Sequence, residues 1–110
     1  MTIQFEKVGG GERFLHLDFP GSSVRIDDDT TFGHFPRGQT FIVQVTLNIN
    51  ASTPNAHIVL SGAGASGEAT RNISPALLPI ARQFGAVRIS SGLEADDSTF
   101  FATTIVVTKN

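Results

Sequence analysis

The chain has 110 residues, a formal net charge of −2, no cysteine and only 16% charged residues. A chain of this length is expected to form a single domain, residues 1–110, with a core of its own. The missing cysteines exclude disulfides and thiolate metal sites, and the eight scattered lysines and arginines argue against a nucleic-acid partner, which needs a basic stripe.

Short alternating segments predict strands at the start of the chain. Residues 3–8 and 13–19 alternate apolar and polar side chains and are separated by three glycines, which favour no single backbone conformation. Pro20-Gly21 is a turn signal, and residues 23–26 form the next short strand. The acids, glycines and proline of residues 27–38 predict a long loop, attached to the body by Phe32 and Phe35.

The clearest element is a strand over residues 40–49. Its apolar side chains recur at every second position for ten residues, which is the period of a strand with one buried face. The residues expected on the buried face are Phe41, Val43, Val45, Leu47 and Ile49. Gln44, Thr46 and Asn48 are expected on the opposite face.

The second half of the chain also consists mainly of segments with strand-like patterns. Further strands are predicted over residues 56–61, 68–73, 86–91 and 99–108. Between the second and third of these, Ser74 and Pro75 suit a helix start, but Pro79 would fall inside that helix without the amide it needs. At most a short helical turn is therefore expected over residues 75–84.

This succession of strands predicts an all-β fold. Seven or eight short strands with turn signals between them are typical of a two-layer antiparallel β-sandwich. The absence of long helical segments excludes alternating β and α units. No run of about 20 apolar residues is present, so no membrane span is expected. The first residues also lack a basic and then apolar pattern, so no signal peptide is expected there.

Motifs for cofactors and metals are weak. Residues 62–67 match G-x-G-x-x-G, but no convincing helix follows, so a flexible turn is favoured over a dinucleotide site. Asp27, Asp28 and Asp29 are candidate oxygen ligands for calcium, although neighbouring side chains on an extended chain point to opposite faces and a solvated loop is the default. The three histidines lack the spacing of a zinc site.

Several segments resemble those of known β-sandwich families. Residues 38–43 (GQTFIV), 84–89 (FGAVRI) and 100–107 (FFATTIVV) resemble the strands of bacterial jelly-roll carbohydrate-binding modules. Residues 17–26 (LDFPGSSVRI) resemble the opening of laminin-G-like, concanavalin-type domains. The resemblance implies a jelly-roll fold. It departs from the carbohydrate-binding pattern at Thr103 and Thr104, where those modules carry paired acids, and in its aromatic residues, all nine of which are Phe.

Together these features favour a non-catalytic binding module for a glycan or another neutral ligand. His34 and Arg37, in the long loop, and Arg88, opposite Val87 and Ile89, are the candidate ligand-binding residues. The alternative is a structural protein that self-associates into a homo-oligomer through an apolar sheet face or edge, which a weakly charged surface would tolerate. No spacing of titratable or nucleophilic residues supports an enzyme.

Overall fold

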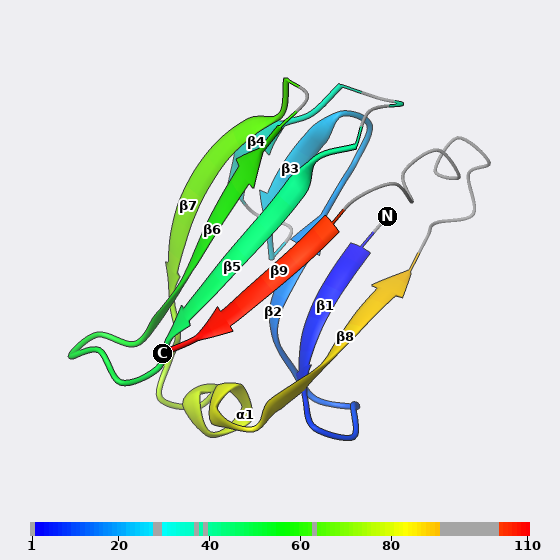
Figure 1. Ribbon diagram of the computed structural model, residues 1–110. Helices are drawn as coiled ribbons and strands as arrows, with labels where there is room; N and C mark the ends of the chain where they lie inside the picture. Colours follow the sequence, from blue (N-terminus) through cyan, green and yellow to red (C-terminus); the bar gives the residue numbers. More distant parts are fainter. Residues whose placement is uncertain (1, 28–29, 37, 39, 63, 91–103) are drawn as a thin grey trace.

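A computed structural model describes residues 2–27, 30–36, 38, 40–62, 64–90 and 104–110. These residues form strands and one short helix (Figure 1). The first half of the chain contains β1 (Thr2–Lys7), β2 (Arg13–Asp18), β3 (Ser23–Ile26), β4 (Thr30–His34) and β5 (Ile42–Asn48). The second half contains β6 (Asn55–Ser61), β7 (Ser66–Asn72), α1 (Leu78–Arg82), β8 (Phe84–Ser90) and β9 (Thr104–Lys109). The prediction of an all-β chain with little helix is confirmed.

The nine strands belong to one sheet with the order β8-β1-β2-β3-β4-β7-β6-β5-β9. Every pair in this order is antiparallel except β5 and β9, which run parallel. The expectation of a purely antiparallel arrangement is wrong at this one pair. The parallel pairing arises because the chain returns to the free edge of β5 after passing through β8, on the far edge of the sheet.

The sheet has two halves that meet at a pair of glycines. β4 and β7 pair through only two residue pairs, Gly33 with Gly67 and His34 with Ser66. A Cβ atom built on Gly33 would lie 2.7 Å from the Ser66 carbonyl oxygen, and one built on Gly67 would lie 2.7 Å from the Gly33 Cα. The two backbones therefore approach as closely as they do only because neither residue has a side chain.

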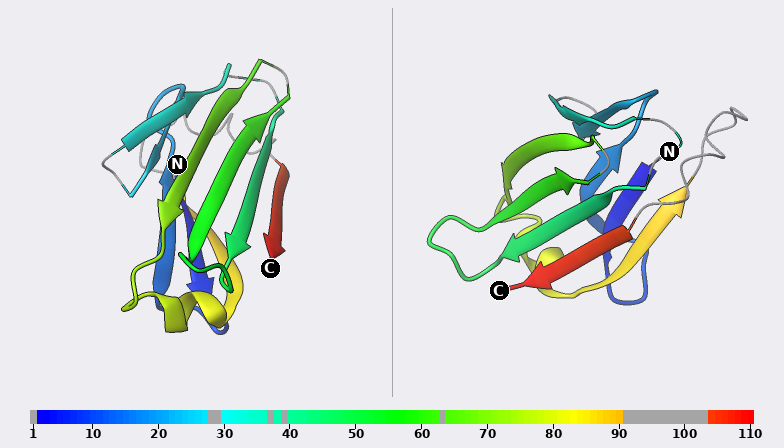
Figure 2. Two further views of the ribbon diagram at one scale, coloured as in Figure 1. Left: turned by 90° about the vertical axis from the view of Figure 1, so that its left-hand side faces the viewer. Right: turned by 45° about the horizontal axis from the view of Figure 1, so that its top comes forward.

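The sheet curls, so that β5 and β9 come to lie opposite β1 and β2 (Figure 2). Apolar side chains from both halves fill the space enclosed by the curl as one core cluster. The long alternating strand behaves as predicted: Phe41, Val43, Val45, Leu47 and Ile49 are all buried. Phe35 is buried as well and stacks on Phe41 with ring centroids 4.9 Å apart, which confirms that it attaches its segment to the body.

One prediction for the first half of the chain needs correction, and β2 has a further feature. The expected loop over residues 27–38 contains β4, because Thr30, Thr31 and Phe32 are good strand formers; Thr30 and Thr31 pair with Ile26 and Arg25 of β3. Both faces of β2 are buried. A register shift opposite Phe5 and Glu6 marks a bulge, and Phe14 packs edge-on against Phe84, with ring centroids 5.8 Å apart.

Helix α1 is short, as expected, but begins later than predicted. Turn-like backbone hydrogen bonds from Leu77 and Leu78 to the Ser74 carbonyl precede it, and Pro79 lies in its first turn, where no helical partner is required of its nitrogen. The helix closes one end of the curled sheet (Figure 1), and its Ala81 is fully buried. Within the described ranges, no helix has the length and apolar character needed to cross a membrane.

Candidate functional site

The structure describes the strands that carry two of the three predicted ligand-binding residues. His34 ends β4, and its Nε2 lies 3.3 Å from the Ser66 hydroxyl across the junction with β7. Arg88 lies on β8, where its backbone pairs with Gln4 of β1, and three strands separate β8 from β4 in the sheet. Arg37 lies outside the described residues. The assignment of these three residues to ligand binding stays a prediction.

Asp27 is the one member of the predicted calcium site that the structure describes; Asp28 and Asp29 lie outside the described residues. Asp27 has a φ of 51°, a left-handed conformation that aspartate tolerates in turns, and its amide donates to the His16 carbonyl. Its carboxylate lies 3.7 Å from the guanidinium of Arg71 on β7. A cation already engages this carboxylate. Among the described residues, no cluster of three metal-ligating side chains is present.

The glycine-rich motif lies in the turn between β6 and β7. Gly62 and Gly64 have φ values of 91° and 83°, and the Ala65 amide donates to the Gly62 carbonyl over 2.8 Å. The element that follows is an antiparallel strand, so the helix that a dinucleotide site requires is missing. The preference for a turn over a nucleotide site agrees with this geometry.

A row of asparagines crosses one end of the outer sheet face. The Asn110 amide nitrogen donates to Asn48 Oδ1 at 3.1 Å, and the Asn48 nitrogen donates to Asn55 Oδ1 at 2.9 Å. Asn55 in turn donates to the Thr53 carbonyl, and its backbone is in register with that of Asn72. We call Asn110, Asn48, Asn55 and Asn72 the asparagine row; they come from the end of β9 and from β5, β6 and β7.

The rest of this outer face is mostly uncharged. The next row consists of Thr108, Thr46, His57 and Thr70, and the one after it of Val106, Gln44, Val59 and Glu68. The single charged contact among them joins His57 Nε2 to Glu68 Oε2 at 2.6 Å. The surface thus presents amides and hydroxyls in register, at the spacing of neighbouring strands, about 4.8 Å.

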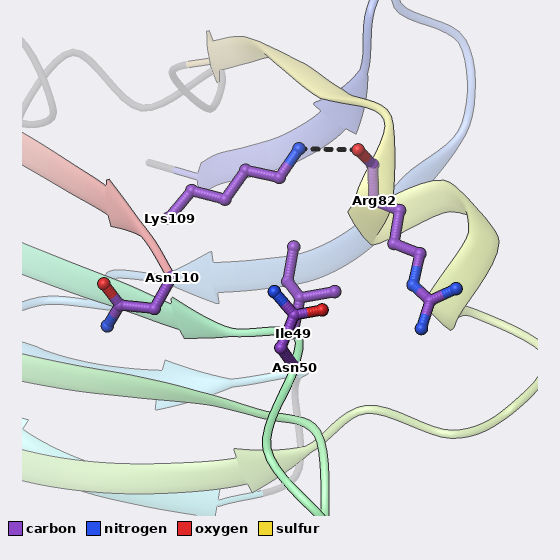
Figure 3. Close-up of a pocket in the computed structure, with 5 residues that line it drawn as sticks. All are labelled: Ile49, Asn50, Arg82, Lys109 and Asn110. Atoms are coloured by element: carbon purple, nitrogen blue, oxygen red, sulfur yellow. Dashed lines mark hydrogen bonds between the residues drawn. The ribbon is translucent and has the colours of Figure 1, made fainter.

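A pocket of about 560 Å³ opens beside this row, where the ends of β5 and β9 approach α1 (Figure 3). Its described lining consists of Ile49, Asn50, Arg82, Lys109 and Asn110. Lys109 extends across the pocket, and its ammonium donates to the Arg82 carbonyl over 2.6 Å. The buried Ile49 side chain and the exposed Asn50 amide lie between the two cationic residues in this view.

Sequence reasoning missed both features. Asn48 was assigned to the polar face of its strand, and a weak signal lay in the symmetric placement of Asn48 and Asn55 around the β5–β6 turn. Asn110 is 62 positions from Asn48, and only the parallel pairing of β9 with β5 brings them together. Lys109 and Arg82 belong to segments whose proximity depends on how the sheet curls.

Comparisons with protein-family models, with curated proteins and with solved structures found no match for this chain.

Proposed function

We propose that this chain is a non-catalytic binding module for a neutral glycan and that the asparagine row is its main contact surface. The observation that carries the proposal is the chain of side-chain hydrogen bonds from Asn110 through Asn48 to Asn55. In such a chain each amide has a fixed orientation, because one of its groups is held by a neighbour.

Fixed carboxamides suit sugar hydroxyls for a chemical reason. A hydroxyl both donates and accepts, and each carboxamide offers two N–H donors and an acceptor oxygen with two lone pairs. The two side-chain hydrogen bonds of Asn48 use one donor and one acceptor position, so a second N–H and a second lone pair remain for a ligand. Because the groups are already oriented, a ligand would lose little affinity to ordering them.

A structural role accounts for the same row in part. Cross-strand amide pairs hold strands in register, and here they link β9, β5 and β6. That role does not require Asn72, whose exposed side chain makes no hydrogen bond among the described residues although it extends the row onto β7. Asn72 therefore distinguishes a binding row from a structural one.

We further propose that the curled sheet is a jelly-roll-like, two-layer sandwich. Support comes from the way β5 and β9 lie opposite β1 and β2 around one apolar core. In this arrangement the outer face of β9-β5-β6-β7 forms one side of the molecule, and we expect a long, neutral polymer to lie across it.

The test is a neutral-glycan array followed by calorimetric titration of the best ligand. Asn72→Ala should weaken binding about tenfold, the loss of one or two hydrogen bonds in a preformed site, and should leave the free energy of unfolding unchanged. The matched control is Gln44→Ala, an exposed amide on the same face but in a different row. An array without any neutral-glycan binding would remove the proposal, as would equal losses in the two variants.

Self-association remains a second candidate, and one observation favours it. Ile42 on β5 and Val106 on β9 are 40% and 41% exposed and lie diagonally across neighbouring strands on the same outer face. Val106 lies on β9 and Ile42 on the strand beside it, and β9 is a sheet edge whose outer backbone groups pair with none of the described strands. An exposed edge with apolar neighbours is a common site of strand-to-strand assembly.

Light scattering after size-exclusion chromatography tests this second candidate. If the β9 edge mediates assembly, the wild-type chain is an oligomer at tens of micromolar, and the pair Ile42→Thr with Val106→Thr shifts it toward monomer. Val8→Thr is the control, because Val8 is 65% exposed but follows β1, in the other half of the sheet. A wild-type chain that is monomeric at these concentrations would rule the candidate out.

A further inference from the structure

The pocket beside α1 carries a second inference, which does not depend on the asparagine row. It lies at the end of the curl that α1 closes, where Lys109 comes from the inner face of β9. The register shows this, because Lys109 pairs with Leu47, whose side chain is fully buried. At the end of the strand the core stops, so the lysine side chain passes from the sheet to the last turn of α1 instead of packing inside.

The ammonium of Lys109 is held in place at one side of the pocket. It donates one hydrogen bond, 2.6 Å long, to the Arg82 carbonyl at the C-terminal end of the helix. An ammonium has three N–H donors, so two remain available. This contact also ties the edge strand β9 to α1, and it fixes a positive charge that would otherwise move freely on a long side chain.

Arg82 supplies a second positive charge from the helix. Elsewhere in the described part of the chain, Arg25 is paired with Asp18, Arg71 with Asp27 and Lys7 with Glu12. The Arg82 guanidinium is exposed and has no carboxylate partner among the described residues. Figure 3 shows it on the opposite side of Ile49 and Asn50 from Asn110.

The described lining of this pocket therefore combines two cations, two amides and one apolar side chain, without an acidic side chain. An oxyanion matches it, because a guanidinium binds a carboxylate or a phosphate through two parallel N–H donors and an ammonium adds a point charge. The volume of about 560 Å³ is that of a small-molecule site. The local charge is opposite to the net charge of −2 of the whole chain.

A simpler role for the two cations is to stabilise the helix. Positive groups near a helix C-terminus interact favourably with the partial negative charge of its carbonyls. That role explains the contact of Lys109 with the Arg82 carbonyl, but it involves only the backbone of Arg82 and predicts no dependence of ligand binding on the guanidinium. The two roles thus differ in a measurable way.

We propose that this pocket binds a small molecule through an oxyanion, with Arg82 as the main contact and Lys109 and Asn50 as supporting donors. A sugar acid and a phosphorylated metabolite share this chemistry, and both would place their anionic group between the two cations.

The experiment titrates the full chain with sodium glucuronate, with inorganic phosphate and with uncharged glucose, by calorimetry and by ¹H–¹⁵N spectra that include the arginine Nε–H signals. We expect at least one of the two anions to bind, with shifts confined to Asn50, Arg82, Lys109 and Asn110. Binding should weaken as salt is raised, because the contact is between exposed charges. Binding of glucuronate would indicate a sugar acid as the ligand, and binding of phosphate would indicate a phosphorylated metabolite.

Arg82→Gln is the decisive variant, because it removes the charge and keeps the backbone carbonyl that Lys109 contacts. It should weaken anion binding about tenfold or more, as expected for the loss of a charge-assisted bidentate contact. The matched control is Arg13→Gln, an exposed arginine on β2 that does not line the pocket but changes the net charge equally. The spectrum of the free variant reports whether α1 is intact.

Two results would overturn the proposal: neither anion saturates the protein up to about 10 mM, or the two variants lose affinity equally. The second would mean that the anions respond only to net charge. Neither result bears on neutral-glycan binding, which the Asn72 variant tests separately.

Discussion

Replacing Gly33 with alanine should loosen the junction between the two halves of the sheet. The new Cβ atom would lie 2.7 Å from the Ser66 carbonyl oxygen, 2.8 Å from Leu60 Cδ1 and 3.0 Å from the Gly67 Cα. Leu60 can rotate, but the other two atoms belong to the backbone of β7 and can yield only if β4 moves away. That movement breaks the two residue pairs that join β4 to β7.

The size of the effect follows from these contacts. Overpacking a well-packed position costs about 1–3 kcal/mol. Losing one net backbone hydrogen bond adds about 1 kcal/mol. We therefore expect Gly33→Ala to lower the free energy of unfolding by about 2–4 kcal/mol, a large part of the roughly 5–15 kcal/mol that a domain has.

Urea denaturation monitored by circular dichroism measures this loss. Gly21→Ala is the comparison, because Gly21 has a φ of 63° and nothing within 4 Å of its Cβ position. Alanine at this position should lower the free energy of unfolding only by the cost of the left-handed backbone conformation, about 1 kcal/mol. If Gly33→Ala costs no more than Gly21→Ala, the close approach of β4 and β7 does not hold the two halves together and the reasoning fails.

Two further predictions concern side chains outside the junction. Burial raises the pKa of Asp18, but its hydrogen bond to Arg25 and the charge of that arginine outweigh burial and leave the pKa below its ordinary value of 3.8. The ion pair therefore contributes stability above pH 3.8 that is lost as the pH falls through the lower, folded-state pKa. From about pH 5 downward, the free energy of unfolding should fall less steeply in Asp18→Asn than in the wild-type chain. Parallel curves for the two proteins would contradict this. Asn48→Ala removes two side-chain hydrogen bonds and should lower the free energy of unfolding in urea by about 1–2 kcal/mol. Gln44→Ala on the same strand face should lower it by less than about 0.5 kcal/mol. Equal losses would show that the asparagine row adds no stability.

The candidate sites illustrate where sequence reasoning stops. Residue type and loop position single out His34 and Arg37, and the strand face opposite Val87 and Ile89 singles out Arg88; the sheet order separates the strands of His34 and Arg88. The asparagine row and the Arg82–Lys109 pocket each combine segments from several strands or from a strand and the helix. Residue type alone did not single them out, because asparagines near turns and basic residues near helix ends are ordinary features of β proteins.

What the sequence determined by itself is the local character of the elements. Alternation places Val43, Val45 and Leu47 on one face whatever the partner strands are, because the period of a strand is a property of its backbone. The same reasoning gave the all-β class and the short helix.

Only the tertiary structure decided which strands meet and in what register. The parallel pairing of β9 with β5 sets Asn110 beside Asn48 and Lys109 beside the end of the core, and the closing of the curl by α1 brings Arg82 to the same pocket. Pairing depends on the combined packing of both sheet halves around one core, with Gly33 against Gly67 at their junction. No single segment contains that information, since each apolar face fits many partners equally well.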